Sequence, residues 1–354
     1  MRTRTCIALG ALLLSAGCAP GPESPESHQT APVIRVAVTV YALQWLVERI
    51  GDSYVEVTTL PVAHREGEPL TGAALTAVEE ADLLIYIGNL GPSIEGLVNA
   101  KPDRYQRIDV SRLDLQLLPI DEDIAAEAIS GADPHIWLDP KNMSTIAGDI
   151  QGALALEIGE SSDFGDQQKK ANDDLIKNLK ETQDTLNTLR SRLLEILRHC
   201  ADRALVVEHP AFGYLTEMAD MEQISLKNIF NQQLPDQVRK DKFAAVDEEY
   251  GRLQAQGRKK TAFGDVGSTG EAGGARQLLV DVQRQWKTEI VYLETLEEPP
   301  EKVGNAVIDY ENGMTRNAED IAVGLDCDVP ASARVSATSE EASPTTLAPT
   351  GQPE

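Results

Sequence analysis

The chain has 354 residues, of which 42% are hydrophobic and 25% are charged. This composition is ordinary for a soluble protein with a buried core, and it excludes the collagen-like, fully disordered and polytopic membrane classes. The 57 acidic residues outnumber the 32 basic ones and give a formal charge of −25. Because such a field repels phosphate backbones, we expect no nucleic-acid partner.

Residues 1–17 have the features of an export signal rather than of a folded element. Arg2 and Arg4 make a basic start, and a short apolar run (CIALGALLL) follows them. A helix that spans a bilayer needs about 20 apolar residues, so this run is too short to cross a membrane. We therefore expect residues 1–17 to be a signal peptide that is removed on export.

The residues directly before Cys18 resemble a bacterial lipobox, in which the signal is cleaved before a cysteine that then carries a lipid. The match departs from the motif at Ser15, where leucine is usual. The stretch 18–33 is rich in Pro, Ser and Glu, which is typical of a tether. We expect a protein that is lipid-anchored to the bacterial membrane through Cys18 and faces the periplasm or the cell exterior. The alternative is an ordinary signal peptide followed by an unmodified cysteine.

Two cysteines, Cys200 and Cys327, remain once Cys6 is removed with the signal and Cys18 is acylated. An exported protein meets an oxidising compartment, so an even remainder is compatible with one disulfide. The sequence cannot show that the two side chains meet. A Cys200–Cys327 disulfide and two separate buried thiols therefore both remain open.

Strand-like and helix-like patterns alternate twice along the chain. The strand-like runs are rich in β-branched residues, and the segments between them have helical spacing. Such alternation predicts an α/β fold with two lobes, each built on a mostly parallel sheet. The predicted strands lie at 34–40, 55–60 and 83–87 in the first lobe and at 204–207, 261–263 and 289–293 in the second.

A long helix is predicted between the lobes, from about residue 164 to residue 200. Apolar residues recur there at steps of three, four and seven, and the segment has no Gly or Pro after Gly165. At 1.5 Å per residue, such a helix is about 50 Å long, which is enough to run across both lobes as a rigid backbone. The alternative is a coiled-coil dimer, but α/β patterns bound the stripe on both sides, and we expect a monomer.

These patterns divide the chain into six parts. The polar, Pro-rich end after the second lobe is too poor in apolar residues to pack, and we expect it to be disordered. The parts are the signal peptide at 1–17, the tether at 18–33, the N-terminal lobe at 34–160, the linking helix at 161–200, the C-terminal lobe at 201–327 and the tail at 328–354.

Three of the five histidines lie at predicted strand-to-helix junctions, where an α/β lobe presents ligands. His64 and His209 each follow a strand, and His135 lies in a loop between two Asp-Pro pairs that bracket a short apolar strand. His28 falls in the tether and His199 at the end of the long helix, so both are expected to be solvated. The three junction histidines are candidate metal ligands.

Three segments and the long helix together resemble the TroA-like or ZnuA-like receptors of bacterial zinc and manganese ABC importers. The segments are 133–140 (DPHIWLDP), 209–214 (HPAFGY) and 310–317 (YENGMTRN). The resemblance covers about residues 34–327. It implies two α/β lobes that clamp one cation in the cleft between them, with a histidine from each of three loops and a carboxylate from a fourth.

Carried over to this chain, the resemblance implies a site made of His64, His135, His209 and Asp265. His135 and His209 match their motifs directly. His64 stands one residue further from a Glu-Pro pair than the family's first histidine does. Asp265 follows a predicted strand of the second lobe and is the counterpart of the family's Glu or Asp ligand. The residues after Asp265 are unusually rich in glycine, so Glu271 is kept as a reserve ligand.

Three imidazoles and one carboxylate complete the tetrahedral shell that Zn²⁺ prefers, whereas Mn²⁺ prefers more oxygen ligands. The family's manganese receptors have Glu at the position of His209, so Mn²⁺ is the less favoured ion here. The resemblance thus implies an extracytoplasmic zinc receptor that passes its ion to an ABC permease and performs no chemistry.

Two other functions stay open at this point. One is a receptor for manganese or another divalent metal, or an adhesin, on the same scaffold. The other is a zinc hydrolase, in which three histidines and a water hold the metal and Glu208 or Asp265 acts as the base. A hydrolase needs an open fourth position, which Asp265 would close.

Overall fold

The computed structural model describes residues 32–60, 70–88, 94, 106–120, 131–230, 234–266, 274–299 and 309–330. Cys18, His64, Glu271 and the tail after residue 330 lie outside this part of the chain. In the described part, none of the helices combines the length and the apolar character that crossing a membrane requires.

The first lobe is built on a parallel sheet with the strand order β2-β1-β3-β4. Its inner strand β3 is buried along its whole length, as expected for a sheet covered on both faces. The fourth strand was not predicted from the sequence. The bounds are Ile34–Val38 for β1, Val55–Thr59 for β2, Leu83–Tyr86 for β3 and Gln106–Asp109 for β4.

The second lobe repeats this arrangement with the order β6-β5-β7-β8, again with all strands parallel. In both sheets the chain moves first to one side of the opening strand and then to the other. The carboxyl ends of strands at such a reversal are where open α/β sheets bind ligands. The bounds are Ala204–Val207 for β5, Glu222–Ser225 for β6, Thr261–Asp265 for β7 and Glu289–Leu293 for β8.

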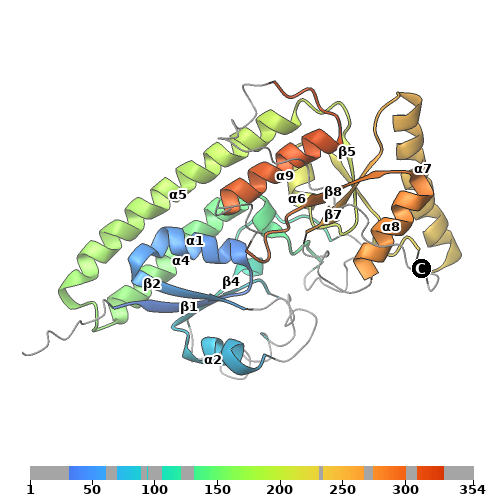
Figure 1. Cartoon of the computed structure of the whole chain (residues 1–354). Helices are drawn as coiled ribbons and strands as arrows, with labels where there is room; N and C mark the ends of the chain where they lie inside the picture. The colour runs from blue at the N-terminus through green and yellow to red at the C-terminus, as the bar shows by residue number, and fades with distance from the viewer. Residues whose placement is uncertain are drawn as a thin grey trace, which may run out of the picture. The chain divides into compact units, whose positions relative to one another are not determined.

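Helices cover both sheets, as the parallel crossovers require (Figure 1). The first lobe carries α1 (Tyr41–Gly51), α2 (Gly72–Glu80) and α4 (Pro140–Glu160). The second lobe carries α6 (Gly213–Met218), α7 (Asp236–Ala255), α8 (Gly274–Trp286) and α9 (Tyr310–Gly324).

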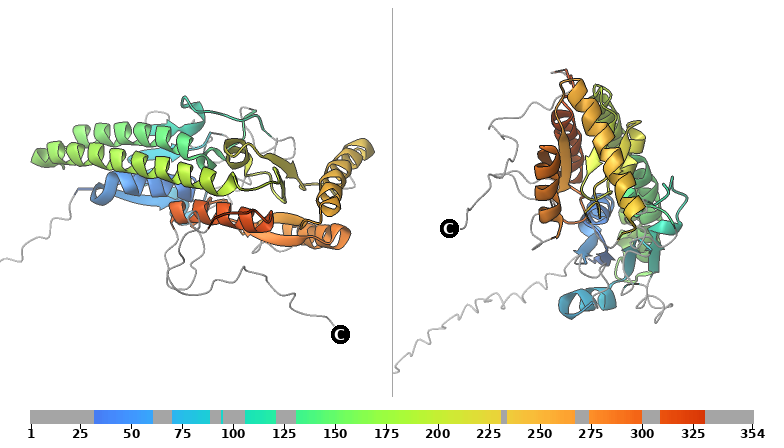
Figure 2. Two further views of the ribbon diagram at one scale, coloured as in Figure 1. Left: turned by 90° about the horizontal axis from the view of Figure 1, so that it is seen from above. Right: turned by 90° about the vertical axis from the view of Figure 1, so that its right-hand side faces the viewer.

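The predicted long helix is α5, a 30-residue helix over Gln168–Leu197 that a single 3₁₀ turn precedes. Its predicted apolar stripe is buried at Leu175, Leu186 and Leu193 and half-buried at Leu179. It packs against α4 and α1 of the first lobe and against α9 of the second, as the left-hand view of Figure 2 shows. One unbroken helix therefore joins the two lobes.

The main hydrophobic core continues from one lobe into the other. Its buried members include Val36 and Trp137 from the first lobe, Leu193 from α5, and Phe263 and Tyr310 from the second. Two smaller clusters cover the outer faces of the sheets. Cys200, at the end of α5, and Cys327, after α9, form a disulfide with a Cα–Cα distance of 4.3 Å.

Candidate metal centre

His135 lies in the loop that leads into α4, with its side chain almost completely buried. The apolar residues after it, Ile136–Leu138, form one 3₁₀ turn and not the short strand that the sequence predicted. The two Asp-Pro pairs explain the difference, because Asp139 caps α4 and Pro140 occupies its first turn, so the chain turns immediately into the helix.

Asp133 orients the imidazole of His135. Its Oδ1 accepts the backbone N–H of His135 at 2.9 Å and lies 2.8 Å from the ring Nδ1. When the ring is neutral, this contact therefore places its proton on Nδ1 and leaves the lone pair on Nε2, which is the form that binds a metal. A carboxylate behind a histidine in this way is a common arrangement in metal sites, where it fixes the tautomer and makes the ligand more basic.

Asp133 is itself enclosed by the second lobe. The hydroxyl of Tyr214 donates to the backbone carbonyl of Asp133 at 2.9 Å. A Cβ atom at Gly213 would come within 2.8 Å of Asp133 Oδ2, so the segment 209–214 can approach this closely only with glycine there. The two sequence motifs that carry the histidines are thus in direct contact.

His209 follows β5 and faces His135 from the second lobe. The two Nε2 atoms are 3.4 Å apart, and the rings meet edge to face at 80°. Zinc–nitrogen bonds of about 2.0–2.1 Å in a tetrahedral shell place neighbouring donor atoms about 3.3–3.4 Å apart. The separation of the two nitrogens therefore fits one edge of such a shell.

Glu297 supplies a carboxylate that the sequence reasoning missed. It lies four residues after the end of β8, and its Oε1 is 3.6 Å from His135 Nε2. Only the order of the strands in the sheet reveals this residue. Strand β8 lies parallel to and next to β7, so the residues that follow β8 reach the same edge of the sheet as those that follow β5 and β7. The Glu-Glu-Pro sequence at 297–299 belongs to none of the motifs that marked the other candidate ligands.

The predicted carboxylate, Asp265, ends β7 at this edge of the sheet. Its backbone N–H lies 3.4 Å from Oε2 of the buried Glu208, the residue before His209. Asp265 and Glu297 are thus two candidates for the one carboxylate position. On their own, the described residues bring no group of three His, Cys, Asp or Glu side chains together closely enough to hold a metal ion. The segment with His64 belongs to the part that is not described.

The electrostatic setting of His135 favours a cation. Burial alone lowers the pKa of His135, but the carboxylates of Asp133 and Glu297 raise it from 6.5 to about 9. Two negative groups beside a buried ring stabilise positive charge, whether a proton or a metal ion carries it. The same site therefore binds a proton in competition with a metal.

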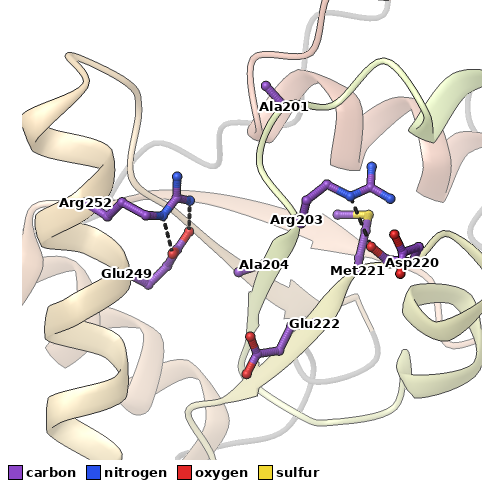
Figure 3. Close-up of a pocket in the computed structure, with 8 residues that line it drawn as sticks. All are labelled: Ala201, Arg203, Ala204, Asp220, Met221, Glu222, Glu249 and Arg252. Atoms are coloured by element: carbon purple, nitrogen blue, oxygen red, sulfur yellow. Dashed lines mark hydrogen bonds and ion pairs between the residues drawn. The ribbon is translucent and has the colours of Figure 1, made fainter.

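A cavity of about 470 Å³ lies elsewhere, at the opposite edge of the second sheet (Figure 3). Ala204 and Glu222, which begin β5 and β6, line it, whereas His209 follows the end of β5. Its two arginines are engaged in contacts within the protein: Arg252 pairs with Glu249 at 2.7 Å, and Arg203 Nε donates to the carbonyl of Asp220 at 3.0 Å. This cavity is separate from the histidine pair.

Residues 36–324 match the family described as "ZnuA: Zinc-uptake complex component A periplasmic". The chain belongs to this family. It is therefore an extracytoplasmic metal-binding receptor of an ABC-type importer and not an enzyme, which excludes the hydrolase alternative.

Similar proteins of known name or structure agree with this membership. A protein of Treponema pallidum (strain Nichols), whose name suggests only metal binding, is 23% identical over 64% of this chain and 71% of its own length. A zinc-bound ZnuA deletion mutant superposes with a TM-score of 0.62 at 20% identity, over 82% of this chain and 98% of the other. The laminin-binding protein Lbp of Streptococcus pyogenes superposes with a TM-score of 0.60 at 19% identity, over 82% of this chain and 99% of the other. At these identities, the structural likenesses show the fold.

Proposed function

We propose that this receptor carries zinc, bound by His135, His209, one carboxylate and His64. The observation that carries the proposal is the pair of Nε2 atoms 3.4 Å apart, one from each lobe, at the separation of neighbouring ligands in a tetrahedral zinc shell. Imidazole nitrogen suits zinc better than manganese, which favours carboxylate and water oxygen. The zinc-bound ZnuA among the similar structures supports the same ion.

Glu297 is the carboxylate that we favour over Asp265. Its Oε1 lies 3.6 Å from His135 Nε2, and a small shift brings it to the about 3.3–3.5 Å that separates an oxygen donor from a nitrogen donor in a tetrahedral zinc shell. The two candidates separate in a matched pair of variants. Glu297→Gln is expected to weaken zinc binding strongly and Asp265→Asn to leave it nearly unchanged, as measured by competition with a zinc chelator. If Asp265→Asn weakens zinc binding more than Glu297→Gln does, Asp265 is the carboxylate ligand instead.

The test of zinc binding uses thermal unfolding of the purified chain. Zinc that binds only the folded state adds about 2.7 kcal/mol at a hundredfold excess over Kd, which raises the melting temperature measurably. His135→Ala and His209→Ala should each lose most of this rise. His199→Ala is the matched control, because His199 lies beyond the end of α5 and pairs with Glu195 at 3.5 Å. A His135→Ala variant with the full rise would contradict the proposal.

The remaining parts of the proposal concern location and delivery. We place the receptor on the outer side of a bacterial membrane as a monomer, anchored through a lipid on Cys18, with 18–33 as its tether. It hands zinc to the permease of an ABC importer. The export features of residues 1–17 and the family's periplasmic location support this arrangement.

A further inference from the structure

The segment 294–297, between β8 and α9, has no regular structure, yet three other elements hold its backbone. The indole N–H of Trp137 donates to the carbonyl of Thr295 at 2.7 Å. The carbonyls of Leu296 and Glu297 accept the first two amides of α1, from Ala42 at 3.3 Å and Tyr41 at 2.7 Å. These amides have no partner within their own helix, so the segment also completes the amino end of α1.

The third contact comes from Asn317 in the middle of α9. Its side chain is completely buried, and its amide bonds the backbone of Glu294 at both groups. Oδ1 accepts the N–H of Glu294 at 2.8 Å, and Nδ2 donates to the carbonyl of Glu294 at 2.8 Å. The side-chain amide of Asn317 thus forms with Glu294, the residue that follows β8, the two hydrogen bonds that the backbone of a neighbouring strand would form. Among common side chains of this size, only asparagine offers both groups at this spacing.

The chain then turns sharply at Leu296, whose φ of +57° is a left-handed conformation that leucine rarely adopts. The Leu296 side chain packs against Gly313, one turn before Asn317 on α9, where a Cβ would meet it at 2.6 Å. Helix α9 thus contacts the segment before the turn, at Glu294, and at the turn itself, at Leu296. The next residue is Glu297, the carboxylate beside His135.

We propose that Asn317 is a positioning residue of the metal centre, which holds Glu294 so that the turn at Leu296 directs the carboxylate of Glu297 toward His135. The proposal rests on the proposed function, because it takes Glu297 as a zinc ligand. Groups that orient a ligand from behind typically change metal affinity 10- to 100-fold when they are removed. Asn317 bonds the backbone of Glu294, so it acts on the position of the Glu297 carboxylate through the backbone of residues 294–297.

The test measures zinc affinity by chelator competition and the visible spectrum of the cobalt-substituted protein. Asn317→Leu keeps the forked shape of the side chain and loses both hydrogen bonds, and we expect about a tenfold or larger loss of zinc affinity and a weaker cobalt spectrum. Asn317→Ala removes the same bonds and serves if the leucine variant does not fold. The matched control is Thr261→Val, which loses a buried 2.6 Å bond to the carbonyl of Gly324 at the far end of α9. The control should change affinity less than twofold.

A double-mutant cycle separates positioning from general loosening of the fold. If Asn317 acts through Glu297, then Asn317→Leu adds no further loss in a Glu297→Gln background. Losses that multiply, or wild-type affinity in Asn317→Leu or Asn317→Ala, would overturn this inference and leave the zinc site intact. Wild-type affinity in Glu297→Gln itself would overturn the choice of Glu297 as ligand, and this inference with it.

Discussion

The hydroxyl of Tyr310 donates a 2.6 Å hydrogen bond to the backbone carbonyl of Trp137. Tyr310 opens α9 in the second lobe, and Trp137 lies two residues after His135 in the first. The indole of Trp137 in turn donates to Thr295, two residues before Glu297. The loop that carries His135 is therefore tied to the second lobe at two points outside the proposed ligand set.

These ties predict that zinc causes only a small change of overall dimensions. Helix α5 contains no Gly or Pro over its 30 residues, and a continuous helix cannot take up a wide hinge motion without breaking backbone hydrogen bonds. Small-angle X-ray scattering with and without zinc should give nearly equal radii of gyration. A large drop on adding zinc would show that the lobes swing.

The Tyr310 bond itself should contribute measurably to stability. Tyr310→Phe leaves the ring in place and removes the donor from a fully buried hydroxyl, which we expect to cost about 1–3 kcal/mol in urea unfolding. Tyr54→Phe is the control, because that hydroxyl bonds Asp174 at 2.7 Å in a partly exposed place and should cost less. Equal losses in the two variants would argue against a special role for Tyr310.

The raised pKa of His135 predicts that zinc binding releases a proton. At pH 7 to 8, a ring whose pKa is about 9 is mostly protonated before zinc enters, so binding should release about one proton from it. Titration calorimetry in buffers of different ionisation enthalpy measures this number, which should fall as the pH approaches 9. No proton released by wild type at pH 7.5, or the same number released by His135→Ala, would contradict the assignment.

The same shift sets how the stability of the metal-free protein depends on pH. Because the folded pKa of about 9 exceeds the ordinary 6.5, the protonated ring stabilises the fold fully below pH 6.5. That contribution is lost as the pH rises through 9. Between pH 6.5 and 9, the melting temperature of the metal-free wild type should therefore fall more than that of His135→Ala. Equal falls in the two proteins would contradict the raised pKa of His135.

Much of the fold could be predicted from the sequence because its signals are local. The stripe that gave α5 and the β-branched runs that gave β1, β3 and β5 are periodic patterns within single segments. Strands β4 and β6 were missed because Gln106–Asp109 and Glu222–Ser225 are short, polar and at sheet edges. The lobe bounds at 160 and 200 stay predictions, since one core continues across them.

The site was only partly predictable for the same reason. His135 and His209 carry motifs that can be recognised in the chain, and the structure brings them together. Glu297 has no such motif, and its place depends on the neighbouring strands, on Asn317 and on the amino end of α1, which are all distant in sequence. His64 stays a prediction.

The disulfide should stabilise the fold without affecting the metal centre. It joins residues 127 positions apart, and closing a loop of that length contributes about 2–5 kcal/mol. The double variant Cys200→Ser, Cys327→Ser should unfold at lower urea concentration and bind zinc with unchanged affinity. A change in affinity larger than the change that Thr261→Val causes would show that the end of α9 communicates with the site.

Lipid attachment at Cys18 is tested by fractionation. The wild-type chain, expressed with its signal, should be found with the membrane, and Cys18→Ala should be released in soluble form, because the short apolar run of the signal cannot hold it as a transmembrane span. Incorporation of a labelled fatty acid should disappear with the same substitution. A Cys18→Ala chain that stays in the membrane fraction would point to an uncleaved or different anchor.

The most direct measurement of the central claim is X-ray absorption at the zinc edge of the loaded protein. We expect four nitrogen or oxygen ligands at about 2.0–2.1 Å, with the outer-shell scattering of imidazole rings reduced in His209→Ala. Replacing Glu297 by Gln should change the first shell, and replacing Asp265 by Asn should not. A six-ligand shell of oxygen atoms, or a spectrum that His209→Ala leaves unchanged, would contradict a zinc site at the His135–His209 pair.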